Sequence, residues 1–160
     1  MPAWIAFFQA QVGASAALAG LVFVGLSISF GRIIASPHLP NRALEALLIL
    51  ALILGLSSLY LVPSQSLRAL GIETLAGGGL IWAWILWLQV STHRSIEPEH
   101  RHHAWINSLF GQIATLWWVL GGAMLLTRGA EGFYWLPPAF LMGYALALFD
   151  AWVLLIEVNR

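Results

Sequence analysis

The chain has 160 residues, of which 60% are hydrophobic and only 9% are charged, and its mean hydropathy is +0.83. Soluble domains carry about 25% charged residues, so this chain has too few charged groups to cover a water-exposed surface, and we expect it to lie in an apolar solvent. Its formal net charge of zero argues against binding to nucleic acid, and the absence of cysteine excludes disulfides and thiolate metal sites.

Five apolar stretches are each long enough to cross a membrane as a helix, since a bilayer core of about 30 Å needs roughly 20 helical residues. In chain order they are residues 8–30, 43–62, 71–90, 105–126 and 136–158. Pro63 follows the second stretch, and Pro137 and Pro138 suit the first turn of the fifth helix. The connections are short, so we expect an all-α, polytopic transmembrane helix bundle that forms a single domain over residues 1–160.

The arginines predict the orientation of the bundle. With five crossings, the N-terminus and the second and fourth connections share one side, which carries Arg68 and Arg128. The opposite side carries Arg32, Arg42, Arg94, Arg101 and Arg160. Because cytoplasmic loops carry the excess of basic residues, we expect the N-terminus outside and the C-terminus in the cytoplasm.

Small residues recur at helical spacing in the first and fifth predicted helices. They are Gly13, Ala16, Ala17, Gly20 and Ser27 in the first, and Ala139, Gly143 and Ala147 in the fifth. In lipid, close approach of backbones drives helix association, and small residues permit it. We therefore expect these stripes to pack against other helices, within one chain or between chains. We also expect the triple glycine 77–79 to mark close packing rather than a break in the third helix.

A polar stretch, "SIEPEHRHHAW" at residues 95–105, precedes the fourth predicted helix. Its glutamates suit a first helical turn, where the helix dipole favours negative charge, and its basic residues then lie at the level of the lipid headgroups. The alternative is a metal site, because Glu97 with His100, and His100 with His103, are spaced i, i+3. The pattern occurs once, and a closed zinc site needs four ligands. We therefore expect no metal and no cofactor, with these three residues as the candidates if a metal binds.

The stretches "FFQAQVGASAALAGLVFVGLSISF" and "LVPSQSLRALG", residues 7–30 and 61–71, resemble small polytopic bacterial membrane proteins of unassigned function. Some of those proteins are labelled as modulators of a membrane-bound AAA protease. The resemblance covers mainly the first half of the chain. It implies a multi-pass location in the bacterial inner (cytoplasmic) membrane, and it supplies no catalytic residues.

Asp150 is the charged residue that is hardest to explain within the predicted helices. A charge at the bilayer centre costs about 2.5–3.5 kcal/mol on insertion scales, and such residues usually face the interior of a bundle. Counting along the helices places Gln112 at the same depth, with Asn107 nearer the cytoplasm, so the three could form one polar layer. Glu45 and Glu73 are expected near membrane interfaces, at the starts of their helices.

Two classes of function fit these features. The first is a non-enzymatic assembly or interaction subunit that acts through helix packing, as a homo-oligomer or with other membrane protein subunits in the lipid bilayer. The alternative is an oligomeric proton or ion channel, or a carrier, that uses Asp150. We expect no intramembrane protease, because serine chemistry would need a histidine within a span and an aspartyl dyad would need a second aspartate.

Overall fold

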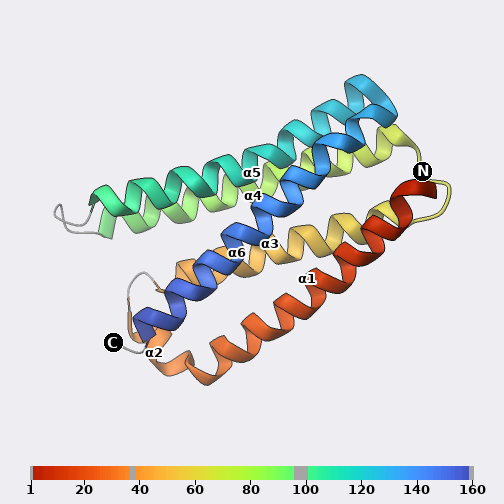
Figure 1. The fold of residues 1–160 in the computed structure, drawn as a ribbon. Coiled ribbons are helices and arrows are strands. Elements are labelled where there is room, and N and C mark those ends of the chain that lie inside the picture. Colours follow the sequence, from red (N-terminus) through yellow and green to blue (C-terminus); the bar gives the residue numbers. More distant parts are fainter. Residues whose placement is uncertain (1, 37–38, 96–100, 159–160) are drawn as a thin grey trace.

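Five long helices run back and forth along one axis in the computed structural model, which describes residues 2–36, 39–95 and 101–158 (Figure 1). They are α1 (Pro2–Ile28), α3 (Leu39–Tyr60), α4 (Leu67–Ser95), α5 (Arg101–Arg128) and α6 (Leu136–Val158). Two short elements complete the order: α2 (Phe30–Ala35) and the 3-10 helix η2 (Gly129–Trp135). Side chains are described for residues 4–36, 39–91 and 108–157. The described residues contain no strand, and the predicted all-α class is confirmed.

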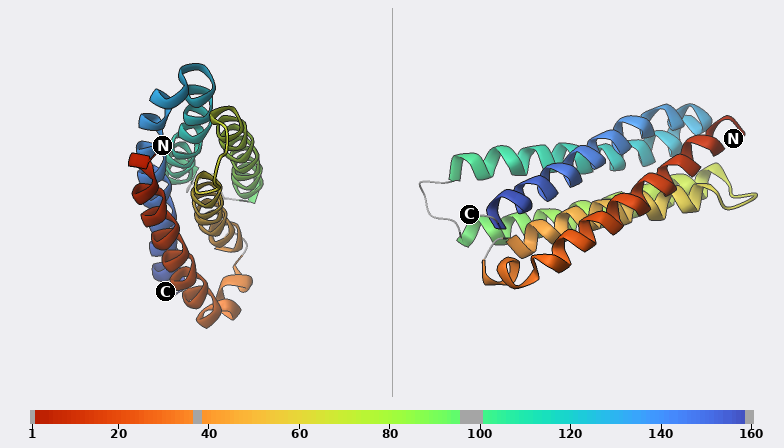
Figure 2. Two further views of the ribbon diagram at one scale, coloured as in Figure 1. Left: turned by 90° about the vertical axis from the view of Figure 1, so that its right-hand side faces the viewer. Right: turned by 60° about the horizontal axis from the view of Figure 1, so that its bottom comes forward.

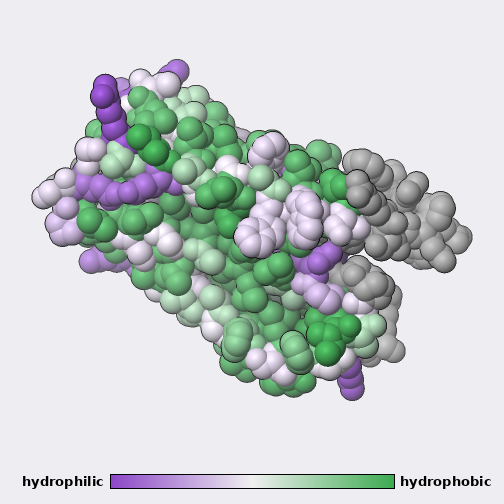
Figure 3. Space-filling view, turned by 180° about the vertical axis from the view of Figure 1, so that it is seen from behind, coloured by the Kyte–Doolittle hydropathy of each residue, from purple (hydrophilic) through white to green (hydrophobic). Residues whose placement is uncertain are grey.

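Four segments of the described chain are long and apolar enough to cross a membrane: Trp4–Ile28, Leu39–Tyr60, Leu67–Ser91 and Ser108–Glu157. The last is 50 residues long because it contains both α5 and α6. These two helices run in opposite directions on either side of η2 (Figure 1). Hydrophobic side chains cover most of the face shown in Figure 3, and hydrophilic ones gather mainly toward its two ends. The chain is thus a membrane protein by the length and composition of its helices.

Helices α3, α4, α5 and α6 enclose the core, and α1 lies outside this ring. Around the ring, α3 packs on α4, α4 on α5, α5 on α6, and α6 on α3. The core includes Ile49, Ile53, Trp118, Phe140 and Leu146, none of which is more than 1% exposed. α1 packs mainly on α3 and makes little contact with α6 (Figure 2).

An aromatic cluster fixes the first half of α1 to the ring. Phe8 stacks on Tyr60 of α3 with ring centroids 4.4 Å apart, and Trp4 stacks on Phe133 of η2 at 5.6 Å. Such pairs contribute about 0.5–1.5 kcal/mol beyond the area that they bury. The second half of α1 is held less closely, and an apolar groove of about 360 Å³ separates it from α6. α1 is therefore anchored chiefly at its N-terminal end.

Glycines let α4 and α5 approach each other closely. A Cβ atom on Gly78 would lie 2.8 Å from the Cβ of Trp118, and one on Gly122 would lie 2.6 Å from the backbone nitrogen of Leu75. Both distances are far shorter than an ordinary carbon contact of about 3.5–4.0 Å. The triple glycine 77–79 accordingly lies inside a continuous helix and marks close packing at Gly77 and Gly78, as the sequence predicted, whereas Gly79 has no described neighbour within 4 Å.

Four helices begin earlier than the sequence predicted. α1 begins at Pro2 instead of residue 8, α4 at Leu67 instead of residue 71, and α5 at Arg101 instead of residue 105. α3 begins at Leu39 instead of residue 43, with Pro40 in a first turn that tolerates proline. The bounds of α6 agree with the predicted 136–158. The early start of α3 has a consequence for the interior, because it places Arg42 and Glu45 inside that helix.

Candidate functional site: a buried polar network

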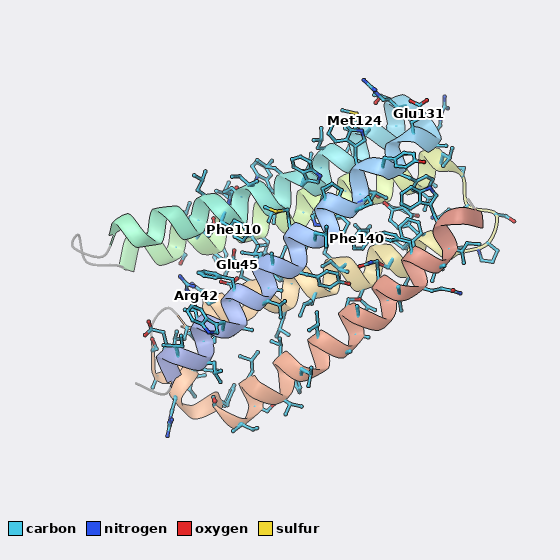
Figure 4. All side chains as sticks on the ribbon, in the orientation of Figure 1. Arg42, Glu45, Phe110, Met124, Glu131 and Phe140 are labelled. Atoms are coloured by element: carbon cyan, nitrogen blue, oxygen red, sulfur yellow. The ribbon has the colours of Figure 1, made fainter. Side chains whose placement is uncertain are left out.

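Asp150 of α6 is completely buried and faces α3. Its side chain is 0% exposed, and its Oδ1 atom lies 3.5 Å from Nη1 of Arg42, which is 23% exposed. Glu45, one turn further along α3, also interacts electrostatically with Asp150. Figure 4 shows Arg42 and Glu45 beside α6, in the half of the bundle toward the C-terminal end of that helix. Three charged side chains thus meet between α3 and α6.

A chain of hydrogen bonds extends from Glu45 across two more helices. Nε2 of Gln89 in α4 donates to Oε1 of Glu45 at 2.9 Å, and Nε2 of Gln112 in α5 donates to Oε1 of Gln89 at 2.8 Å. Nε1 of Trp82 in α4 donates to Oε1 of Gln112 at 2.7 Å. We refer to Arg42, Glu45, Trp82, Gln89, Gln112 and Asp150 as the polar network. Every helix of the ring contributes to it.

Gly111 makes room for this network on the surface of α5. A Cβ atom at this position would lie 2.6 Å from Nε2 of Gln89 and 3.0 Å from Oε1 of Glu45. Any larger residue would push the Gln89 amide away from the Glu45 carboxylate. The hydrogen bond between α3 and α4 therefore depends on the absence of a side chain on a third helix.

The structure brings some of the polar residues singled out from the sequence together and places others apart. Asp150 and Gln112 both belong to the polar network, but by different contacts: Gln112 is hydrogen-bonded through Gln89 to Glu45, and Asp150 is ion-paired with Arg42. Ser27 lies on the exposed surface, where it donates to the carbonyl of Phe23 in its own helix at 2.8 Å. The side chain of Asn107 lies outside the described residues.

The first-turn position predicted for Glu45 was wrong. The sequence left it at the start of its helix, whereas α3 begins at Leu39, and Glu45 is only 5% exposed and accepts a hydrogen bond from Gln89. The error followed from the predicted start of α3 at residue 43, which left Glu45 in the first turn. Pro40 was the available signal, since proline is favoured at the first position of a helix. A start at residue 39 places Glu45 almost two turns inside the helix and spaces it i, i+3 from Arg42.

The two stripes of small residues have different environments. In α6, Ala139 and Ala147 are buried, and a Cβ atom on Gly143 would lie 3.1 Å from Cδ1 of Ile53 in α3. In α1, the stripe is exposed along its length at Gly13, Ala16, Ala17 and Gly20. A Cβ atom on Gly13 or Gly20 would have no described neighbour within 4 Å. The α6 stripe is used within the chain, and the α1 stripe is not.

The predicted metal candidates lie where the structure gives no side chains. Glu97 and His100 fall outside the described residues, as does the side chain of His103. Among the residues that are described, no three His, Asp or Glu side chains lie close enough together to hold a metal ion.

These observations define a class: a helical membrane protein with a charged, hydrogen-bonded network in its interior. Comparisons of the chain with protein-family models, with curated proteins and with solved structures found no match. Its function is therefore inferred from the polar network and from the surfaces of its helices.

Proposed function

We propose that the chain is a non-enzymatic membrane subunit that assembles through the outward face of α1, with a second copy of itself or with another subunit of a membrane complex. The observation that carries this proposal is the exposed small-residue stripe of α1. The buried side of the helix, which includes Phe8, Ser15 and Val22, packs toward the ring. The stripe lies on the opposite side, because the two sets of residues differ by about half a turn at 3.6 residues per turn.

A bare stripe of this kind suits a helix partner better than lipid alone. Small residues lower the distance at which two backbones can meet, and in a bilayer that packing is a main source of association energy. The α6 stripe illustrates the same chemistry inside the chain, where Gly143 lies against Ile49 and Ile53. The outward face of α1 carries a similar stripe of small residues, and no described residue of the chain packs against it.

The proposal includes five crossings, a bacterial inner-membrane location and a cytoplasmic C-terminus. The order of the helices supports the orientation, because Arg32, Arg42 and the junction of α4 with α5 lie at one end of the bundle. Arg68 and Arg128 lie at the other end, at the start of α4 and the end of α5. The end with more arginines is the one expected on the cytoplasmic side.

The substitution Gly20→Leu tests the α1 face. Because a Cβ atom at Gly20 meets nothing within 4 Å, the isolated chain should fold normally, and only the assembly should be lost. Native mass spectrometry from a mild detergent should show wild-type oligomers or complexes, and mainly single chains for the variant. Leu21→Ile is the matched control, since Leu21 is 70% exposed on a neighbouring face and the change conserves volume.

Two results would count against the proposal. If the wild-type protein is a single chain both in mild detergent and after cross-linking in membranes, then α1 is not an assembly helix. If Gly20→Leu and Leu21→Ile behave alike while an oligomer persists, then the interface lies elsewhere. Gly143→Leu provides a contrast, because it clashes inside the chain and should lower the yield of folded protein.

The second candidate is an oligomeric proton or ion channel, or a carrier. The burial of Asp150 among charged groups favours it, because ionisable residues within membrane helices commonly mark ion pathways. Purified protein in liposomes should then carry a proton or cation flux that Asp150→Asn abolishes while the fold is kept. Absence of flux from the wild-type protein would exclude this candidate.

A further inference from the structure

The hydrogen bonds of the polar network all point the same way. The indole N–H of Trp82 can only donate, so Gln112 must present its carbonyl oxygen to it. The amide group of Gln112 is then left for Gln89, which must accept with its oxygen and donate with its own amide group to Glu45. The direction of the whole chain is therefore fixed by one tryptophan, and it ends on a carboxyl oxygen of Glu45.

This arrangement offsets part of the cost of burying a negative charge on Glu45. A carboxylate is stabilised by hydrogen bonds that are donated to it, and a chain of aligned bonds polarises each member in the same direction. The guanidinium group of Arg42 also interacts with Glu45. The ionised form of Glu45 thus has both a donor and a counter-charge.

Asp150 has a different environment. Neither of its carboxyl oxygens accepts a hydrogen bond from the described residues, although the side chain is 0% exposed. Among the described side chains its near cation is Arg42, which it shares with Glu45. An ionised carboxylate with no hydrogen bond is costly in an apolar interior, and a neutral carboxyl group is much less so.

The net charge of the cluster also favours a neutral, protonated Asp150. With both acids ionised, the three charges of Arg42, Glu45 and Asp150 sum to +1 − 1 − 1 = −1. One added proton makes the cluster neutral. We propose that the Arg42, Glu45 and Asp150 cluster is a proton-binding site, in which Asp150 holds a single exchangeable proton and Glu45 stays ionised.

No other described group supplies the missing positive charge. The described parts of α1 and α6 carry no basic side chain, and α2 contributes only Arg32, which is exposed. On α5 and η2, the described charged residues are Arg128 and Glu131, both exposed at the opposite end of the bundle. On α4, the described charged residues are Arg68 and Glu73, in its first two turns and so at the opposite end of the bundle. The side chains of His93 and Arg94 at the end of α4, and of Arg101, His102 and His103 at the start of α5, lie outside the described residues.

The exchange involves only a proton. It comes from the aqueous phase at the end of the bundle where α3 begins, and it adds to one carboxyl oxygen of Asp150; on release it returns to the same phase. Arg42 lies at the end of the first turn of α3 and is partly exposed, so it connects the buried cluster to that end. Release leaves a net negative charge between α3 and α6, so proton binding strengthens the contact between these two helices.

The proposed proton site is separate from the assembly face that we propose for α1, and an experiment can disprove either proposal without affecting the other. Asp150 is the only aspartate in the chain, so its protonation can be observed without a substitution. Protein made in a cell-free reaction with aspartate labelled by ¹³C at the side-chain carboxyl carbon should give a single labelled aspartate resonance in lipid nanodiscs. At neutral pH we expect this resonance at the position of a neutral carboxylic acid, moving to the carboxylate position as the pH is raised.

Variants identify the groups that hold the proton. In Glu45→Gln, Asp150 alone must balance Arg42, so the neutral-pH resonance should move to the carboxylate position. In Glu157→Gln, which changes an exposed residue at the end of α6, the resonance should stay where it is in the wild type. A wild-type resonance at the carboxylate position at neutral pH would overturn the proposal, as would one that stays neutral at every pH at which the protein is folded. Both of these results come from the wild-type protein alone, so they do not depend on how Glu45→Gln folds.

Discussion

The adjacent glycines Gly78 and Gly79 offer a direct test of how closely α4 and α5 pack. A Cβ atom on Gly78 would lie 2.8 Å from the Cβ of Trp118 and 3.2 Å from its carbonyl carbon, whereas one on Gly79 meets nothing within 4 Å. Both residues lie in the middle of the same helix. Alanine at either position therefore has the same effect on helix propensity, and only the contact with α5 differs.

The expected difference follows from these distances. Replacing glycine with alanine inside a helix stabilises it by up to about 1 kcal/mol, and this should be the whole effect of Gly79→Ala. In Gly78→Ala, the two helices must separate by roughly 0.8 Å to restore a carbon contact of about 3.6 Å. A gap of that size removes about a quarter to a half of the dispersion energy of each nearby contact. Measured costs of overpacking a core are about 1–3 kcal/mol. Because the propensity gain is the same in both variants and cancels, we expect Gly78→Ala to be less stable than Gly79→Ala by about 1–3 kcal/mol.

Tryptophan fluorescence can follow unfolding as the fraction of a denaturing detergent in mixed micelles is raised. Trp118, one of the nine tryptophans of the chain, lies in the contact itself, so its share of the total emission should change when α4 separates from α5. Equal unfolding free energies for the two variants would refute the reasoning, because they would show that the helices have space at Gly78.

Three further predictions concern the polar network and the topology. Arg42→Leu leaves Glu45 without its counter-charge and should lower the unfolding free energy by about 3 kcal/mol, whereas the exposed Arg128→Leu should change it little. Gly111→Ala should break the hydrogen bond between Gln89 and Glu45 and destabilise the protein, while Gly55→Ala, with no described neighbour within 4 Å, should be neutral or stabilising. Both pairs can be compared in the same unfolding assay, and equal losses within a pair would contradict the network. In this cysteine-free chain, an impermeant thiol reagent added to intact cells should label cysteines on the outer side only. The outer positions are Ser64 and Ala130, and the positions that should stay unlabelled are Ser36 and Ser95; labelling of either of the latter would reverse the orientation or change the number of crossings.

The sequence predicted the features of the structure that local residue signals, such as prolines and unbroken apolar runs, determine. The bounds of α6 were correct because Pro137 and Pro138 mark its start and an unbroken apolar run follows. The packing role of Gly77 and Gly78 was also predictable, since glycine allows backbones to approach, but the sequence did not show that Gly79 faces open space. The start of α3 was misplaced because the polar residues of its first turns were assigned to the connection before it. That error concealed Glu45 and Arg42.

Other features could not be predicted because they depend on contacts between distant segments. Periodicity shows that Gly13 and Gly20 share a face of α1, but it does not show whether that face meets the ring or points away from it. Depth counting placed Gln112 near Asp150. It could not identify Gln89 as the residue that joins α5 to α3, because that depends on the rotation of α4 about its own axis.

The charged cluster also imposes an order on the biosynthesis of the protein. Asp150 lies on α6 and follows Arg42 by 108 residues, since 150 − 42 = 108, so it is synthesised after α3, α4 and α5. Chains grow from the N-terminus at about 5–20 residues per second, so α3 waits several seconds for α6 to emerge. During this interval Arg42 and Glu45 are near the end of α3, where long side chains can reach the headgroup region. Gln89 and Gln112 are synthesised next, on α4 and α5, and the packed interior is complete only after α6 has been inserted with Asp150.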